Sequence, residues 1–271
     1  MNKICAHMIC RYEPFIVYAV ESVINYVDKM LIYETGSRNA PFADRTIEDC
    51  EMLALKYPDK IVFKEIPIDD ETPWSVAKYN QFRQYMAGKK CKGEVRRQQI
   101  LDTPEEFTYC WIVDADEIYY EKDAKTIKEE LCQKIWGKVE NIRVPIRWFY
   151  DTTHYFEGYG ANRTTGRFFL TAKTDMVVQS PGELHMSKTT GRPFSFEDMN
   201  MMVAPNLGYM THWEGLLKRW RRIVPGKALV KYDKPLPEVM VANSYYIERF
   251  EKELKVDREK YFVSKQKELG L

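Results

Sequence analysis

The sequence has almost no net charge and no long apolar run, and both absences narrow its possible functions. Its 41 Lys and Arg residues against 40 Asp and Glu residues leave a formal charge of +1 at pH 7. Such a balance gives the chain as a whole no attraction to nucleic acid or to an acidic membrane. No segment approaches the ~20 apolar residues of a membrane helix, and residues 1–4 lead into a strand-like run without a secretory signal. We therefore expect a cytoplasmic protein with no membrane span.

Closely paired cysteines are also lacking. The six cysteines stand at positions 5, 10, 50, 91, 110 and 132, and no two of them form a C-x-x-C pair. This spacing indicates neither a zinc knuckle nor a redox motif. Several of the cysteines lie within apolar patterns, so we predict buried free thiols, which suit a reducing cytoplasm.

The first part of the chain alternates predicted strands and helices. Hydrophobic residues form 45% of the 271 residues, which is enough for one large domain or two closely packed halves. Short apolar runs predict strands, and apolar residues spaced three and four apart predict helices. The expected strands are 3–10, 30–33, 60–66 and 109–113, and the expected helices are 14–27 and 46–57. This alternation predicts an α/β fold with a mostly parallel sheet and helices on both faces.

The pattern changes after residue 123. The stretch from Trp148 to Trp213 is rich in aromatic residues, glycine and threonine, which is typical of a mixed sheet that builds a pocket. The expected elements are a helix at 124–136, strands at 141–150 and 166–172, and a charged helix from 244 to the end. We therefore expect three regions, with boundaries 1–123, 124–215 and 216–271.

Three carboxylates directly follow the fourth predicted strand, in Asp114-Ala115-Asp116-Glu117. Ligands of open α/β sheets bind outside the carboxyl ends of the strands. Oxygen-rich clusters suit hard cations such as Mg²⁺ or Mn²⁺, which can bridge two phosphates and neutralise a departing diphosphate. The alternative is an acidic turn that caps the next helix.

The motifs together resemble glycosyltransferases of family two and their relatives with the GT-A fold. In those proteins the first strand leads into a polar segment with an acidic residue, matched here by Arg11-Tyr12-Glu13-Pro14. Their second strand typically ends in Asp-x-Gly-Ser, matched here by Glu34-Thr35-Gly36-Ser37. An arginine upstream matches Arg97, and the Asp-x-Asp-Glu motif matches the carboxylates that begin at Asp114. The resemblance covers residues 3–120, and beyond residue 120 it is limited to short segments.

The resemblance implies a GT-A type, Rossmann-like sheet and metal-dependent transfer of a sugar from a nucleotide-sugar, with a UDP-sugar as the expected donor and Mn²⁺ or Mg²⁺ as the metal. Region 1–123 would bind the donor, 124–215 the acceptor, and 216–271 would be a basic, helical end. The implied donor-binding residues are Arg11, Glu34, Gly36, Ser37, Arg97 and Asp114. Glu34 would bind the base, although the family has aspartate there, and Asp114 and Asp116 would hold the metal. The sequence does not distinguish among a glycan, a lipid, a protein and a nucleic acid as the acceptor.

The resemblance also points to late histidines and a late acidic base. Among only four histidines, His185 best matches a further metal ligand and His212 comes second, although a core or loop role is the default interpretation for each. An inverting transfer needs a base for the acceptor proton. The candidate catalytic residues are Glu197, Asp198 and Glu117, while capping of a helix accounts for Asp198 as well.

Three other classes remain as alternatives. A nucleotidyltransferase shares the sheet and the metal, but usually has a glycine-rich first loop that is lacking here. A dehalogenase-type phosphatase uses Asp-x-Asp on its first strand, whereas the motif here follows the fourth. A non-catalytic carbohydrate- or nucleotide-binding protein of the same fold is the third, and the intact carboxylates argue against it.

Overall fold

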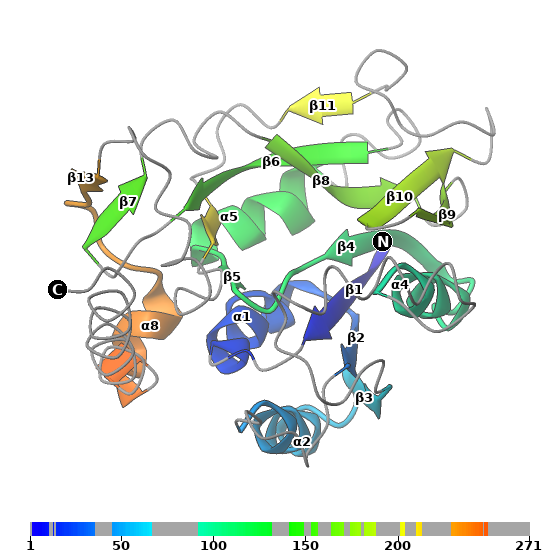
Figure 1. The fold of residues 1–271 in the computed structure, drawn as a ribbon, viewed down its shortest axis with the longest axis horizontal. Coiled ribbons are helices and arrows are strands. Elements are labelled where there is room, and N and C mark those ends of the chain that lie inside the picture. Colours follow the sequence, from blue (N-terminus) through cyan, green and yellow to red (C-terminus); the bar gives the residue numbers. More distant parts are fainter. Residues whose placement is uncertain are drawn as a thin grey trace, which may run out of the picture.

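The computed structural model describes residues 2–10, 13, 15–35, 45–66, 92–131, 141–148, 153–156, 164–170, 174–179, 182–187, 201–203, 210–212, 229–245 and 247–248. Figure 1 shows a long twisted sheet with helices packed along it. Among the described residues, no helix combines the length and the apolar character that a bilayer crossing requires.

Four parallel strands form one half of the sheet, in the order β3-β2-β1-β4. They are β1 (Lys3–Cys10), β2 (Lys29–Glu34), β3 (Ile61–Glu65) and β4 (Phe107–Ile112). All four predicted strands are confirmed, and β1 has the predicted bounds. The short apolar runs succeed as predictors because parallel strands are covered on both faces and need apolar side chains on each.

Three helices cover the two faces of this parallel half (Figure 1). On one face lie α1 (Ile16–Val23), which continues as a 3-10 turn, and α2 (Thr46–Lys56). On the other face lies α4 (Lys92–Leu101). Alternate side chains of β1 divide accordingly, since Ile4, Ala6 and Met8 join the α1–α2 core, whereas Cys5 and Ile9 pack with Val95 of α4. This is the period of two expected for a strand buried on both sides.

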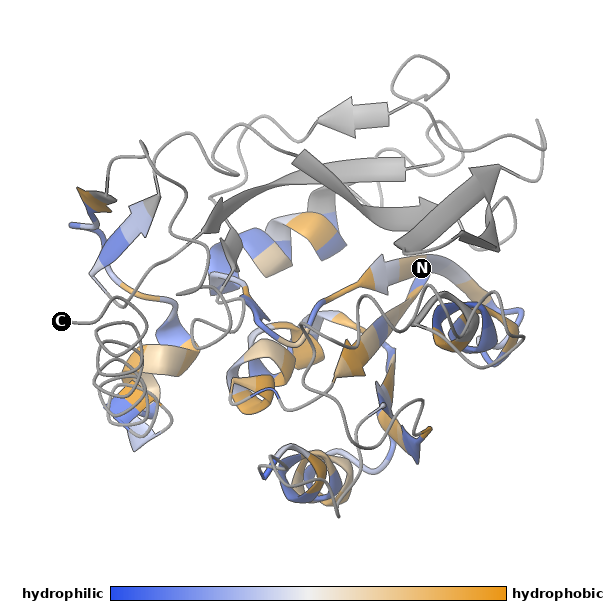
Figure 2. Ribbon diagram, viewed as in Figure 1, coloured by the Kyte–Doolittle hydropathy of each residue, from blue (hydrophilic) through white to orange (hydrophobic). Residues whose placement is uncertain are grey.

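The two faces differ in polarity. Figure 2 shows hydrophobic residues concentrated on α1 and β1, whereas α4 is largely hydrophilic. Although α4 is hydrophilic, two of its polar residues, Arg96 and Gln99, are fully buried. The sequence of α4 therefore presents polar side chains to the interior, and buried polar groups require hydrogen-bond partners.

The sheet continues into a mixed half, as predicted. Strand β8 (Thr164–Leu170) lies antiparallel to β4 and to β6 (Asn141–Trp148), and β12 (Met210–His212) joins β6 in parallel. The edge is β5 (Glu117–Ile118), antiparallel to β12. The shorter strands are β7 (His154–Phe156), β9 (Thr174–Gln179), β10 (Gly182–Ser187), β11 (Met201–Val203) and β13 (Leu229–Lys231). The predicted α/β class, with a mostly parallel sheet and a mixed second half, is confirmed.

The helix predicted at 124–136 begins earlier and changes form. It starts as α5 (Glu121–Thr126) and continues as a π-helical turn at Ile127–Leu131, and residues 132–140 lie outside the described part. The earlier start has two causes: acidic residues in the first turn favour a helix N-terminus, and the Glu121 N–H donates to Glu238 Oε2 at 2.9 Å.

The end of the described chain returns to the first half. Helix α8 (Glu238–Ala242) packs near α1, and the Tyr18 hydroxyl donates to the carbonyl of Asn243. The charged helix predicted from residue 244 onward lies mostly outside the described residues. The region boundaries at 123 and 215 stay predictions, although the sheet itself runs without a break from β3 to β5.

Candidate functional site

The candidate site lies at the carboxyl edge of the parallel strands. Cys10 at the end of β1 pairs in register with Glu34 at the end of β2, and His7 pairs with Ile112 near the end of β4. The chain departs from β1 toward β2 and β3 on one side, and β4 lies on the other side. The strand order therefore reverses between β1 and β4, which is where open α/β sheets bind ligands.

The carboxylates after β4 form a tight turn at this edge. The Glu117 N–H donates to the Asp114 carbonyl at 2.9 Å, and the Asp114 N–H donates to Glu117 Oε2 at 3.1 Å. The two residues thus close the turn from both ends, and Glu117 is fully buried. Asp116 is buried, while the side chain of Asp114 keeps 24% exposure. The hydrogen bond from the Asp114 N–H to the Glu117 carboxylate is a structural contact within the turn.

Arg96 is the charged neighbour of this turn. Its Nη2 lies 3.7 Å from Asp114 Oδ1, and its Nη1 donates to Gln99 Oε1 at 2.7 Å. A guanidinium is always charged and needs a partner when it is buried. The contact places a positive charge from α4 directly beside a carboxylate of the turn.

The structure places Arg96, and not Arg97, beside the turn. Arg97 is exposed on α4, because successive helical residues point about 100° apart. The buried positions of α4 are Val95, Arg96 and Gln99, a spacing of three and four that marks one helix face. Sequence reasoning missed Arg96 and Gln99 because this buried face is polar, and a search for apolar periodicity does not detect it.

Glu34 is fully buried at the end of β2. Its carbonyl accepts the Ile66 N–H at 2.7 Å, and the next residue, Thr35, donates both its N–H and its hydroxyl to the Cys10 carbonyl. Burial raises the pKa of the Cys10 thiol well above its usual value, and the Cys50 thiol and the Glu34 carboxylate raise it further. Cys10 therefore stays protonated next to Glu34.

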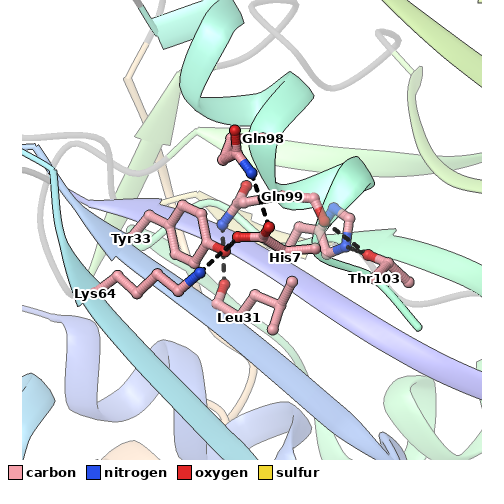
Figure 3. Close-up of polar contacts among 8 residues, drawn as sticks. His7, Leu31, Tyr33, Lys64, Gln98, Gln99 and Thr103 are labelled. Carbon is pink, nitrogen blue, oxygen red and sulfur yellow. Dashed lines mark hydrogen bonds and ion pairs between the residues drawn. The ribbon is translucent and has the colours of Figure 1, made fainter.

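Polar contacts fix α4 and the residues that follow it to the sheet (Figure 3). Gln99 Nε2 donates to the carbonyls of Met8 and Leu31, at 2.7 and 3.0 Å. The Thr103 hydroxyl donates to the Gln99 carbonyl and lies 2.7 Å from His7 Nε2. His7 is therefore a core histidine.

A second set of contacts ties the end of α4 to β2 and β3. Lys64 Nζ and Gln98 Nε2 each donate to Asp102 at 2.7 Å, and Tyr33 donates its hydroxyl to the same carboxylate. Burial alone would raise the pKa of Asp102, but the three hydrogen bonds outweigh it and the pKa is lowered. These contacts fix the position of the C-terminal end of α4 relative to β2 and β3.

The two late histidines lie in different places. His212 on β12 is the register partner of Glu117 on β5, so its backbone adjoins the carboxylate turn. His185 on β10 pairs with Met176 of β9, in a separate two-stranded sheet beside α4. Figure 1 draws β10 well apart from β5. The backbone thus brings His212, and not His185, next to Glu117.

Several predicted site residues lie outside the described part of the chain. They are Arg11, Gly36, Ser37, Glu197 and Asp198. Within the described residues, no group of three or more His, Cys, Asp or Glu side chains is arranged to hold a metal ion. The donor set of the turn nevertheless fits a hard cation, because Asp114 and Asp116 offer carboxylate oxygens.

The C-terminal part of the described chain contacts the segment directly after the turn. The Tyr120 hydroxyl donates to the Pro235 carbonyl at 2.9 Å and is hydrogen-bonded to the Tyr232 hydroxyl. Tyr26 donates to Glu121 Oε1 at 3.1 Å. These contacts hold residues 120–121 between α1 and the C-terminal segment.

Comparisons with known proteins give likenesses to solved structures only. No protein-family model matches the sequence, and no curated protein matches it. One similar structure is glucosyl-3-phosphoglycerate synthase from Mycobacterium tuberculosis in complex with UDP, at 13% identity and a TM-score of 0.34 over 55% of this chain. The match covers 46% of that protein, less than half of its length.

Two further solved structures are similar to this chain. The 4-diphosphocytidyl-2C-methyl-D-erythritol synthase of Anaerococcus prevotii has 7% identity and a TM-score of 0.37, over 63% of this chain and 71% of that chain. The inositol-1-phosphate CTP transferase of T. maritima has 8% identity and a TM-score of 0.34, over 87% and 91%.

Proposed function

We propose that this chain is a metal-dependent glycosyltransferase that moves a sugar from a nucleotide-sugar, with a UDP-sugar as donor. The observation that carries the proposal is the carboxylate turn at Asp114–Glu117, which lies at the carboxyl edge of the parallel sheet, beside the switch in strand order. A divalent cation held there would neutralise the diphosphate of a bound donor.

Each residue of the edge takes a role in this proposal. Asp116 holds the cation, and Asp114 contributes to the same ion or to the ribose. Glu34 binds the nucleoside base from the end of β2, two strands away from β4, which corresponds to ~10 Å at the usual strand spacing. That span suits a ligand with a base at one end and a diphosphate at the other.

Arg96 is the arginine of α4 that contacts the carboxylate turn, and its proposed role is to act on Asp114. Its Nη2 lies 3.7 Å from Asp114 Oδ1, so its positive charge attracts that carboxylate. Arg97 is exposed and lies on another side of the helix. Gly36, Ser37 and Arg11 stay candidate donor contacts on the sequence argument alone.

A transfer that inverts the anomeric carbon requires a base for the acceptor proton. The acceptor oxygen attacks the anomeric carbon, the bond to the diphosphate breaks, and the nucleoside diphosphate leaves with the bonding electrons. The acceptor proton passes to a carboxylate, for which Glu197 and Asp198 stay the candidates. We propose that Glu117 shapes the turn instead, because its carboxylate accepts the Asp114 N–H. His212 is the preferred histidine ligand, because it is the register partner of Glu117.

Nucleotidyl transfer is the second candidate, because the same carboxylate edge suits the phosphates of a nucleoside triphosphate equally well. One assay separates the two reactions. The purified chain is incubated with Mn²⁺ and a panel of nucleotide-sugars, or with nucleoside triphosphates and sugar phosphates. Release of nucleoside diphosphate from the sugar panel supports glycosyl transfer, and release of pyrophosphate supports nucleotidyl transfer. Binding without either product would instead indicate the non-catalytic alternative.

A further inference from the structure

Gln99 of α4 joins the sheet to the arginine beside the carboxylate turn. It is fully buried under the sheet, and its amide makes three hydrogen bonds. Nε2 donates to the carbonyls of Met8 on β1 and Leu31 on β2, and Oε1 accepts from Arg96 Nη1. Figure 3 shows this amide between α4 and the two strands.

These contacts permit only one orientation of the amide. Rotation by 180° would place Oε1 against two carbonyl oxygens and would turn the N–H groups toward a guanidinium, which has no acceptor. The two strand carbonyls therefore fix Oε1 on the side of Arg96. The position of this acceptor is set by the backbone of the sheet and not by a flexible side chain.

The fixed acceptor in turn fixes Arg96. An arginine side chain has several rotatable bonds and loses much rotamer entropy when it is held in place. Here Nη1 donates a hydrogen bond to Gln99 Oε1, which orients the planar guanidinium, and Nη2 lies at the ion-pair distance of 3.7 Å from Asp114 Oδ1. The chain of contacts runs from the sheet through Gln99 and Arg96 to the carboxylate turn.

We propose that Gln99 is a positioning residue of the donor site, which acts through Arg96 on the orientation of Asp114. This inference rests on the proposed function, because it assumes that Asp114 takes part in donor binding. Gln99 itself touches neither donor nor metal. Its contribution to donor binding therefore exists only while Arg96 is present.

A double-mutant cycle tests this dependence. Gln99→Met keeps the length of the side chain but removes all three hydrogen bonds, and Arg96→Met removes the charge. The affinity for UDP with Mn²⁺ is measured by calorimetry for the wild type, both single variants and the double variant, and melting temperatures are recorded in parallel. Thr103→Val is the matched control, because it removes a buried hydroxyl that follows α4 and contacts Gln99 only through its backbone carbonyl.

We expect Gln99→Met to weaken UDP binding about tenfold, the lower bound for loss of a hydrogen bond to a charged group. In the Arg96→Met background the same substitution should change the Kd less than about twofold, because coupled residues are not additive. Thr103→Val should lower the melting temperature and leave the Kd unchanged. If Gln99→Met does not fold, Gln99→Asn carries the same test, since the shorter amide cannot reach all three partners.

Two results would overturn the inference while the proposed function stands. One is a folded Gln99 variant that binds UDP as the wild type does. The other is an equal loss of affinity in both backgrounds, which would mean that Gln99 acts without Arg96. A wild-type protein that binds no UDP with Mn²⁺ would overturn the proposed function and this inference together.

Discussion

Glu117 offers the sharpest test of how the carboxylate turn is built. Its Oε2 accepts the Asp114 N–H at 3.1 Å and its own N–H donates to the Asp114 carbonyl. Glu117→Ala removes the charged acceptor and leaves the backbone donation intact. A hydrogen bond to a charged group contributes about 1.5–3 kcal/mol, so we expect a loss of about 2 kcal/mol and a melting temperature lower by about 4–8 °C. Glu117→Gln keeps an oxygen at the same place and should lose about 1 kcal/mol.

The assay is urea unfolding of the wild type and both variants, together with UDP titrations in Mn²⁺. The ranking of stability should be wild type, then Glu117→Gln, then Glu117→Ala, and UDP affinity should fall in the same order because the turn carries Asp114 and Asp116. Glu117→Ala with wild-type stability would refute the structural role. Glu117→Gln with normal stability and normal UDP affinity but no turnover would make Glu117 the base.

Three further predictions concern other parts of the structure. Cys5, Cys10, Cys50 and Cys110 are buried free thiols, so mass spectrometry after brief alkylation should find them modified only in unfolded protein. Because the pKa of Asp102 is lowered in the folded protein, its charged carboxylate stabilises the fold fully above the ordinary aspartate pKa of about 3.9. This stabilisation is lost as the pH falls through the lower pKa of the folded state. The free energy of unfolding in urea should therefore depend less on pH between pH 5 and 3 in Asp102→Asn than in the wild type. His212→Ala should weaken the Mn²⁺ dependence of UDP binding more than His185→Ala, and the reverse ranking would favour the β10 histidine.

The parallel half of the fold was predictable because its signals are local. Each of its strands is a short apolar run, and the bounds observed for β1 are the predicted ones. The carboxylates fall after β4 as expected, since their position depends only on where that strand ends. Parallel register then brings Glu34 to the same edge without any further information from the sequence.

The mixed half was harder to predict because its elements are short and depend on distant partners. Strand β12 has three residues, too few for any periodicity, and pairs with both β6 and β5. The adjacency of His212 and Glu117 follows from that pairing alone. Arg96 escaped prediction for a different reason, because a buried polar helix face has no apolar period, and one residue along a helix changes the direction of the side chain.

The most direct test of the central claim is UDP binding by calorimetry, with and without Mn²⁺, in the wild type and in Asp116→Asn. Asp59→Asn is the matched control, because it makes the same charge change at an exposed turn between α2 and β3. The account predicts that the wild type and Asp59→Asn bind UDP only with the metal, and that Asp116→Asn loses most of this affinity. Equal binding by Asp116→Asn, or equal binding in EDTA, would contradict it.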